Sequence, residues 1–168
     1  GKPIYAVGAV VLITLLAFFL RTHHLLTIPP GFNYDEAAHA MDALEVLQGH
    51  ITVWSARSGG NPMLFMYFIA ASFGLLGAHP FAQRLVVVFL STATIPAVHL
   101  LAKTMFRRYG RARAQFLGVL AALGLATSFW HLKHSRMGLE FNPAPCFEVL
   151  SFYFMWRALL DGRRWYAL

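Results

Sequence analysis

The sequence predicts an all-α integral membrane protein with about four transmembrane helices and juxtamembrane interfacial helices in its first outer loop. The chain has 168 residues, of which 58% are hydrophobic and 12% are charged, about half the charged share of a soluble domain. Several uncharged runs approach the roughly 20 residues that cross a bilayer. Basic residues gather in one connection between such runs, which is typical of a cytoplasmic loop.

Four apolar segments are predicted to span. The first, Pro3 to Leu20, has no charge, and Arg21 follows it without a small-residue cleavage site, so we expect a retained helix. The second contains Pro96, which neighbouring helices can accommodate. The fourth is the weakest, because Glu148 and Arg157 lie within it. The spans are expected near residues 3–20, 85–102, 116–132 and 147–160.

Two further segments of the first outer loop are predicted to lie on the membrane surface. Apolar residues between 37 and 47 recur at helical spacing, and Asn33 and Gly49 are suited to begin and end that helix. A second apolar segment, Met63 to Leu76, is short for a span. We therefore expect interfacial helices near residues 34–48 and 62–77.

The distribution of Lys and Arg predicts the orientation. If segment 62–77 does not cross, the basic loop 103–113 shares a side with Lys2, Arg163 and Arg164, and that side holds most of the basic residues. If the segment crosses, the basic loop lies on the outer side, against the usual excess of Lys and Arg in cytoplasmic loops. We therefore expect the N-terminus and loop 103–113 on the cytoplasmic side of a plasma (cell) membrane.

Charge and cysteine content exclude several function classes. The formal net charge is +7, but its clustering in one loop indicates a topology signal and contact with membrane lipids, and no nucleic acid partner. The single cysteine, Cys146, excludes an internal disulfide and a cysteine-based zinc site. The histidines lack the spacing of known zinc motifs, so the sequence leaves any metal unknown.

An acidic pair, Asp35 and Glu36, follows the first span and is the most informative feature of the chain. Glu36 lies three residues after Asn33, which matches a capping box; the alternative is a contact with substrate. Asp35 has no capping role at the second helical position. A carboxylate at the membrane face can act as a general base that takes the proton of an acceptor hydroxyl.

A second polar stretch, after the third predicted span, contains Arg136 and Glu140. An arginine fork bonds two phosphate oxygens at once, and Glu140 would orient Arg136, bind a divalent cation or contact a sugar. The alternative is a plain ion pair at a helix end, since the two are four residues apart. Arg84, and Arg57 in the turn-forming stretch 57–62, are further candidates for binding phosphate; for the latter the alternative is a plain loop.

These motifs follow one another in a definite order. A first span leads to Pro29–Glu36 and an amphipathic helix, then to Asn61–Leu64, Phe81–Leu85, a basic loop, and Ser135-Arg136 before Glu140. In this order they resemble the N-terminal part of the GT-C membrane glycosyltransferases, most closely the branch of protein O-mannosyltransferases and lipid A aminoarabinose transferases.

The resemblance implies a function. Members of the family take a sugar from a polyprenyl-phosphate donor and invert its anomeric carbon, which makes Asp35 the implied base and Glu140 the implied assisting acid. A lipid-linked sugar is then the implied partner, and we expect the chain to be the N-terminal region of a larger fold. One departure is Gly60-Asn61, where this branch often has a polar pair such as Glu-Lys.

The alternative hypothesis is a non-catalytic subunit, packed against other membrane subunits of a larger complex and built on a truncated glycosyltransferase fold. The departure at Gly60-Asn61 favours it, and the 15 Phe and 6 Tyr suit lipid and protein contacts. A transporter fragment would need matching breaks in paired spans, which the sequence lacks. The enzyme hypothesis requires that Asp35, Arg136 and Glu140 converge on one cavity.

Overall fold

The computed structural model describes residues 3–57 and 59–161, and over these residues the chain is mostly helical (74%), with seven α-helices. Lys2, Arg163 and Arg164, on which the predicted orientation draws, lie outside the described residues. The elements are α1 (Pro3–Thr22), α2 (Tyr34–Leu47), β1 (Trp54–Ser55), β2 (Asn61–Pro62), α3 (Leu64–Leu76), α4 (Pro80–Met105), the 3-10 helix η1 (Arg107–Tyr109), α5 (Arg111–Thr127), α6 (Phe129–His134) and α7 (Ala144–Asp161).

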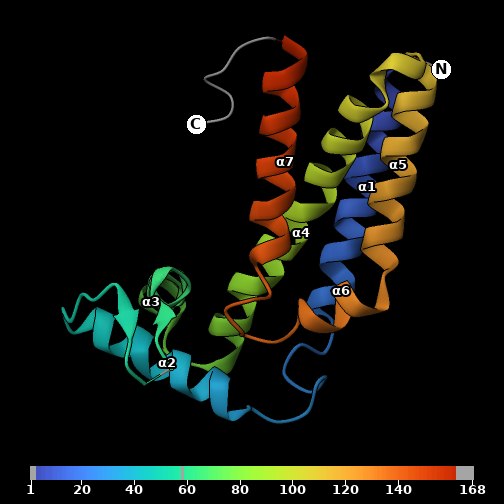
Figure 1. Ribbon diagram of the computed structural model, residues 1–168. Coiled ribbons are helices and arrows are strands. Elements are labelled where there is room, and N and C mark those ends of the chain that lie inside the picture. Colours follow the sequence, from blue (N-terminus) through green and yellow to red (C-terminus); the bar gives the residue numbers. More distant parts are fainter. Residues whose placement is uncertain (1–2, 58, 162–168) are drawn as a thin grey trace.

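Helix α4 is the centre of the bundle. It contacts α1, α3, α5 and α7, and Figure 1 shows α1, α4 and α5 running alongside one another with α7 beside them. Among the described residues, two helices are long and apolar enough to cross a membrane, Tyr5–Thr22 within α1 and the whole of α4. Pro96 lies inside α4 without ending it.

Small residues allow the bundle helices to approach closely. Ala17 of α1, and Ala122 and Ala126 of α5, are fully buried against Ile95 of α4. At Gly118 of α5, an added Cβ would lie 2.9 Å from the backbone oxygen of His99 in α4. Close backbone approach at such points is a common way for membrane helices to pack.

Helices α2 and α3 have a different direction from the bundle. Figure 1 shows α2 lying across the bundle axis and α3 seen nearly end-on, beside one end of α4. The two helices share an apolar cluster that includes Ala43, Met66, Ile69 and Phe73. This cluster also takes in Val87 of α4, which anchors the pair to the bundle.

The predicted start of α2 is confirmed. The Asn33 side chain accepts the backbone N–H of Glu36 at 2.7 Å, and the Glu36 carboxylate accepts the backbone N–H of Asn33 at 3.3 Å, which completes a capping box. After the helix, Gly49 has a φ of +92°, a conformation that glycine adopts without steric cost.

Two details differ from the sequence prediction. The helix expected near 116–132 begins earlier, at Arg111, and ends at Thr127, because Ser128 is extended (φ −59°, ψ 122°) and separates α5 from α6. The chain is also not strictly all-α: β1 and β2 form a two-stranded antiparallel hairpin. The turn signal at Gly59-Gly60 is clear in the sequence, but strands of two residues leave no alternating pattern to detect.

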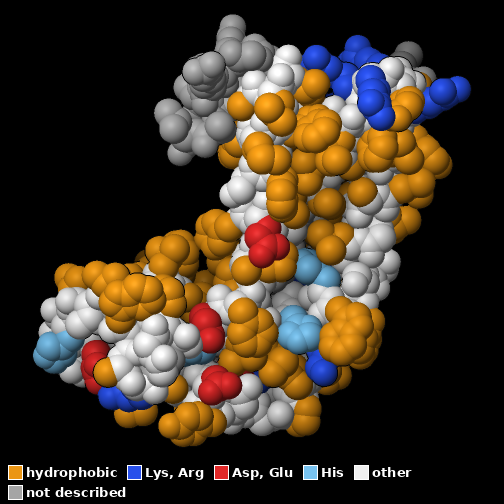
Figure 2. All heavy atoms as spheres, in the orientation of Figure 1, with side chains coloured by type: hydrophobic (Ala, Val, Ile, Leu, Met, Phe, Trp, Pro, Cys, Tyr) orange, Lys and Arg blue, Asp and Glu red, His pale blue; other side chains and the backbone are white. Residues whose placement is uncertain are grey.

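The surface separates apolar from charged regions. Figure 2 shows hydrophobic side chains over much of the bundle, and a group of Lys and Arg at the end where Figure 1 places the connection between α4 and α5. Further charged side chains lie around the opposite end. On α1, large side chains such as Tyr5, Leu12 and Leu15 are 60 to 71% exposed. Apolar surface of this extent marks contact with lipid or with other protein.

The close approach of α4 and α5 predicts opposite effects of alanine at two glycines of α5. Gly118→Ala forces the new methyl against the His99 carbonyl and should lower the free energy of unfolding by about 1–3 kcal/mol. Gly124 has nothing within 4 Å of its added Cβ, so Gly124→Ala should be neutral or stabilise by up to about 1 kcal/mol. Denaturation in mixed micelles, followed by circular dichroism, measures both. Equal effects of the two substitutions would contradict this packing.

Candidate functional site

A buried ion pair connects the elements at the end of the bundle opposite the basic loop. Arg84 of α4 makes five hydrogen bonds, as many as its guanidinium has N–H groups. Two go to the Glu36 carboxylate, each at 2.9 Å. The other three go to backbone carbonyls of the connection between α1 and α2, those of Leu25, Pro29 and Gly31.

Glu36 extends this network to the loop before α7. Its carboxylate accepts the backbone N–H of Gly138 at 2.7 Å, and Gln83 donates to the carbonyls of both Glu36 and Gly138. Burial by itself raises the pKa of Glu36, but the hydrogen bond and charge of Arg84 and the Gly138 N–H outweigh it, so the net shift is downward. Glu36 is therefore an anion at neutral pH, and its contacts stabilise the fold.

Arg136 also holds backbone carbonyls. Its Nε donates to Ile28 at 2.9 Å, and its two terminal nitrogens donate to the carbonyls of Leu20 and His23. Burial lowers the pKa of the Arg136 guanidinium, and the charge of Arg84 adds to this effect. Together the two arginines hold residues 20–31, where carbonyls without helical partners need donors.

Arg57 joins the hairpin to α2. Its guanidinium pairs with Asp42 at 3.2 Å and with Glu45 at 2.7 Å, and one third of its side chain is exposed. Each of the three arginines predicted to bind phosphate therefore makes contacts with the chain itself. The alternative of an ion pair between Arg136 and Glu140 on one helix is wrong, because residues 135–143 are not helical.

The two carboxylates predicted to be catalytic differ in their surroundings. Asp35 is exposed, and within the described part of the chain no hydrogen bond or ion pair engages its carboxylate. Glu140 is partly buried; it accepts a hydrogen bond from Asn61 Nδ2 at 2.8 Å, and its other oxygen lies 2.9 Å from His39 Nε2. Because Glu36 bonds Gly138, the start of α2 and the loop that carries Glu140 meet at the same end of the molecule.

His39 is a site residue that the sequence did not single out among its histidines. Its Nδ1 lies 3.3 Å from the Gly138 carbonyl while its Nε2 faces the Glu140 carboxylate. Both neighbours are hydrogen-bond acceptors, so the ring lies between two oxygen atoms. The sequence signal for His39 as a site residue is its spacing: it follows Glu36 by three residues and so shares the same face of the helix.

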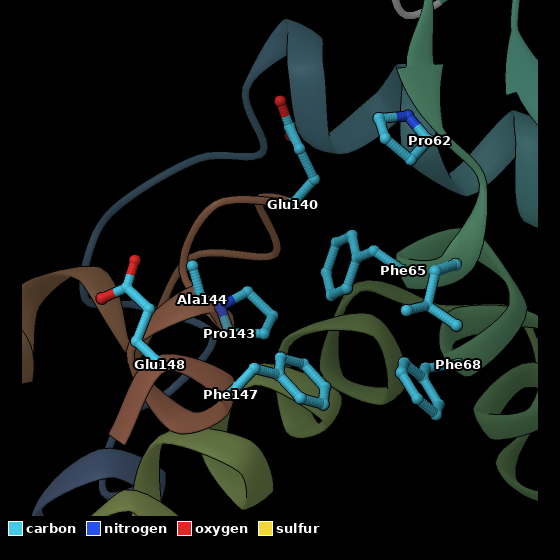
Figure 3. A pocket seen from close by; sticks show the side chains of 9 residues that line it. Pro62, Phe65, Phe68, Glu140, Pro143, Ala144, Phe147 and Glu148 are labelled. Atoms are coloured by element: carbon cyan, nitrogen blue, oxygen red, sulfur yellow. The ribbon is translucent and has the colours of Figure 1, made fainter. Parts of the chain in front are cut away.

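An apolar pocket of about 310 Å³ opens beside Glu140. Figure 3 shows the rings of Phe65, Phe68 and Phe147 around a common space, with Glu140 and Glu148 at its edges. The aromatic side chains come from α3 and α7. Asp35 and the three arginines do not line this pocket. The structure thus brings Asp35, Arg136 and Glu140 to one end of the bundle, but none of the pockets found among the described residues is lined by all three. The expected convergence of these three side chains on one cavity is therefore not found in the described part of the chain.

A second buried contact lies on the α6 side of the same end. Arg21 Nη2 is 2.7 Å from His131 Nδ1, and because arginine only donates, Nδ1 must be the acceptor. The proton of the neutral ring is therefore on Nε2. Burial, aided by the charge of Arg21, lowers the pKa of His131 to about 4, which keeps the ring neutral at pH 7.

Comparison of the chain with protein-family models, with characterised proteins and with solved structures finds no match. Among the described residues, no group of three or more His, Cys, Asp or Glu side chains is arranged to hold a metal ion.

The buried network predicts a large stability difference between two glutamates of α2. Glu36→Gln removes the charge that Arg84 faces and should lower the free energy of unfolding by about 3–5 kcal/mol, because it leaves a buried cation uncompensated. Glu45→Gln breaks a pair whose carboxylate side chain is 48% exposed and should cost less than about 1 kcal/mol. Unfolding of both variants by increasing SDS in mixed micelles provides the comparison. A loss at Glu36 no larger than at Glu45 would exclude a central structural role for the ion pair.

Proposed function

We propose that this chain is the N-terminal region of an inverting GT-C-type membrane glycosyltransferase, which moves a sugar from a polyprenyl-phosphate donor to an acceptor hydroxyl at the outer membrane face. One observation carries the proposal: two adjacent carboxylates have opposite surroundings. Glu36 is buried and fully engaged, whereas Asp35 is exposed with no partner among the described residues. Glu36 fixes the start of α2, and the Asp35 carboxylate is free to contact a substrate.

The arrangement of the helices supports a membrane location. Because α5 and α7 run beside α1 and α4 (Figure 1), we assign all four as spans of a plasma (cell) membrane. Helices α2 and α3 lie across the bundle and would rest at the interface, where an amphipathic or short apolar helix is stable. The basic loop, at the opposite end, would then face the cytoplasm.

In the proposed reaction Asp35 takes the proton of the acceptor hydroxyl. The hydroxyl oxygen forms a bond to the anomeric carbon while the bond from that carbon to the phosphate oxygen breaks, and the lipid phosphate leaves with the electron pair. Direct displacement inverts the carbon and needs a single base on the acceptor side. An exposed carboxylate in the first turn of a capped helix, with no partner among the described residues, suits this role.

Glu140 and its pocket would hold the donor. The apolar walls of Phe65, Phe68 and Phe147 suit a prenyl chain, and Glu140, positioned by Asn61 and His39, suits sugar hydroxyls. The roles expected for the arginines change, because Arg84 and Arg136 bond backbone carbonyls. Arg136 is therefore not part of the proposed catalytic set, and the proposal requires only that Asp35 and Glu140 face the same side of the membrane. Arg84 and Arg136 instead position the loops around Asp35. The negative charge that develops on the leaving phosphate must then be stabilised by another cation, and Arg57, which is partly exposed, is the candidate.

The alternative is a non-catalytic subunit of a larger membrane complex. The engagement of all three arginines by the chain itself favours it, since it leaves the phosphate without an evident partner in the described residues. The exposed apolar side chains of α1 would in that case contact other membrane subunits.

The role of Asp35 predicts a specific loss of activity. Asp35→Asn in the full-length protein should lower sugar transfer by about 10²–10⁴-fold, the usual contribution of a general base, with little change in stability because the side chain is exposed. The assay uses membranes supplied with a panel of radiolabelled polyprenyl-phosphate sugars. Met41→Ala, at another exposed position of the same helix, is the control and should keep activity. Full activity of Asp35→Asn would remove the assigned role, and no transfer by the wild type with any donor would favour the structural subunit.

A further inference from the structure

A pocket of about 450 Å³ lies at the basic end of the bundle, opposite the end that holds the buried ion pair. Helices α4 and α7 diverge toward this end (Figure 1), and residues of both helices, of η1 and of α5 line the pocket. Four cationic side chains are among them: Lys103 of α4, Arg107 of η1, Arg111 of α5 and Arg157 of α7. Because they come from four elements, the tertiary fold brings these charges together.

The positive charge of this pocket is not compensated by an acidic side chain in its wall. No Asp or Glu is among the described residues that line it. The side chains of Lys103, which is half-buried, and of Arg107 and Arg111 make no hydrogen bond or ion pair with the described part of the chain. By contrast, Arg108 donates to the Tyr109 hydroxyl and lies over its ring. Like charges around one cavity repel one another, so an anion inside it would be stabilising.

The polar groups of the lining are hydrogen-bond donors. Arg157 Nη1 donates to the Tyr153 hydroxyl at 3.4 Å, which leaves the phenolic hydrogen of Tyr153 to donate into the pocket. Ammonium and guanidinium groups only donate, and the Thr104 hydroxyl donates to its own helix, to the Leu100 carbonyl at 2.7 Å. A set of donors with net positive charge matches anionic oxygens, and guanidinium groups pair well with phosphate.

A second pocket, of about 430 Å³, adjoins the first, since Thr104 and Arg107 line both. Most of its other lining is apolar or aromatic and includes Met105, Phe106, Tyr109, Trp156 and Leu160. Trp and Tyr are enriched where a membrane helix meets water. A cationic pocket beside an apolar one suits an amphipathic ligand, with an anionic headgroup in the first and part of an acyl chain in the second. A free anion would occupy only the first.

The number of cations indicates the charge of the headgroup. A single phosphodiester has one negative charge, whereas four cations line the pocket. A headgroup with two phosphodiesters matches them more closely, and the pocket lies in the range of about 300–1,000 Å³ that is typical of ligands larger than one phosphate. Basic pockets between membrane helices on the cytoplasmic side suit headgroups of this kind.

We propose that the cationic pocket binds the headgroup of a cytoplasmic-leaflet glycerophospholipid that has two phosphates. The inference rests on the membrane location proposed above but on no step of the transfer reaction. None of the residues assigned to that reaction lines the pocket, and the polyprenyl-phosphate donor would bind at the opposite face of the membrane.

Binding is tested with the full chain in dodecyl maltoside micelles by native mass spectrometry, which counts bound lipids. Diphosphatidylglycerol should bind saturably, and phosphatidylglycerol, with one phosphate, should bind about tenfold more weakly. Sodium diphosphate distinguishes a free anion from a lipid. It should bind more weakly than diphosphatidylglycerol, because it gains nothing from the apolar pocket; tighter binding of diphosphate would exclude the lipid as the occupant.

Two arginines of α5 provide a matched pair of variants. Arg111→Gln should weaken the binding of diphosphatidylglycerol about tenfold. It should not lower the melting temperature of the lipid-free protein, because it relieves repulsion among the remaining cations. Arg113→Gln removes the same charge from an exposed position of the same helix that does not line the pocket, since residues two apart do not share a helical face. Its affinity should be unchanged.

Two further variants separate this site from folding and from the transfer reaction. Lys103→Gln, on α4, should weaken lipid binding as Arg111→Gln does. Asp35→Asn should bind the lipid normally, so loss of transfer and loss of lipid binding are separate results. Equal weakening by Arg111→Gln and Arg113→Gln would show diffuse attraction to the basic end and overturn the proposal, as would the absence of saturable binding of diphosphatidylglycerol.

Discussion

The buried ion pair between Glu36 and Arg84 is the interaction on which the rest of the structure depends. Removing two charges from water costs several kcal/mol for each ion, and the cost is offset here because every donor of Arg84 finds an acceptor. The pair joins α2, α4, the connection after α1 and the loop at Gly138. Together with the apolar cluster of α2 and α3, it fixes the position of α2 against α4.

The same interaction decides which acidic residue at the start of α2 is left exposed. With Glu36 turned inward as cap and ion pair, its neighbour Asp35 is presented outward on the first turn of α2. The arginines of this region hold carbonyls of an irregular segment, a role that matters near lipid, where unsatisfied backbone groups cost several kcal/mol. A positively charged residue beside a predicted active site can therefore be part of the scaffold.

Local features of the fold could be predicted from the sequence, whereas long-range contacts could not. The helix start at Asn33 follows from residue spacing, and the position of α1 follows from an uncharged run. The break at Ser128 has no Gly or Pro signal, and the cap of α4 is a histidine, His79, which is not among the usual capping residues. The partners of Arg84, Arg136 and His131 lie 48 to 116 residues away in sequence, beyond any periodic pattern.

The central claim is that Asp35 and Glu140 meet their substrates at the outer face, across the membrane from the basic loop. Single cysteines in a Cys146→Ala background, reacted with a membrane-impermeant maleimide on intact cells, test this most directly. Tyr34→Cys and Leu75→Cys occupy positions that are 81% and 85% exposed in the native chain. The account predicts that both react in intact cells and that Arg113→Cys reacts only after permeabilisation. Labelling of Arg113→Cys and Tyr34→Cys from the same side would contradict it.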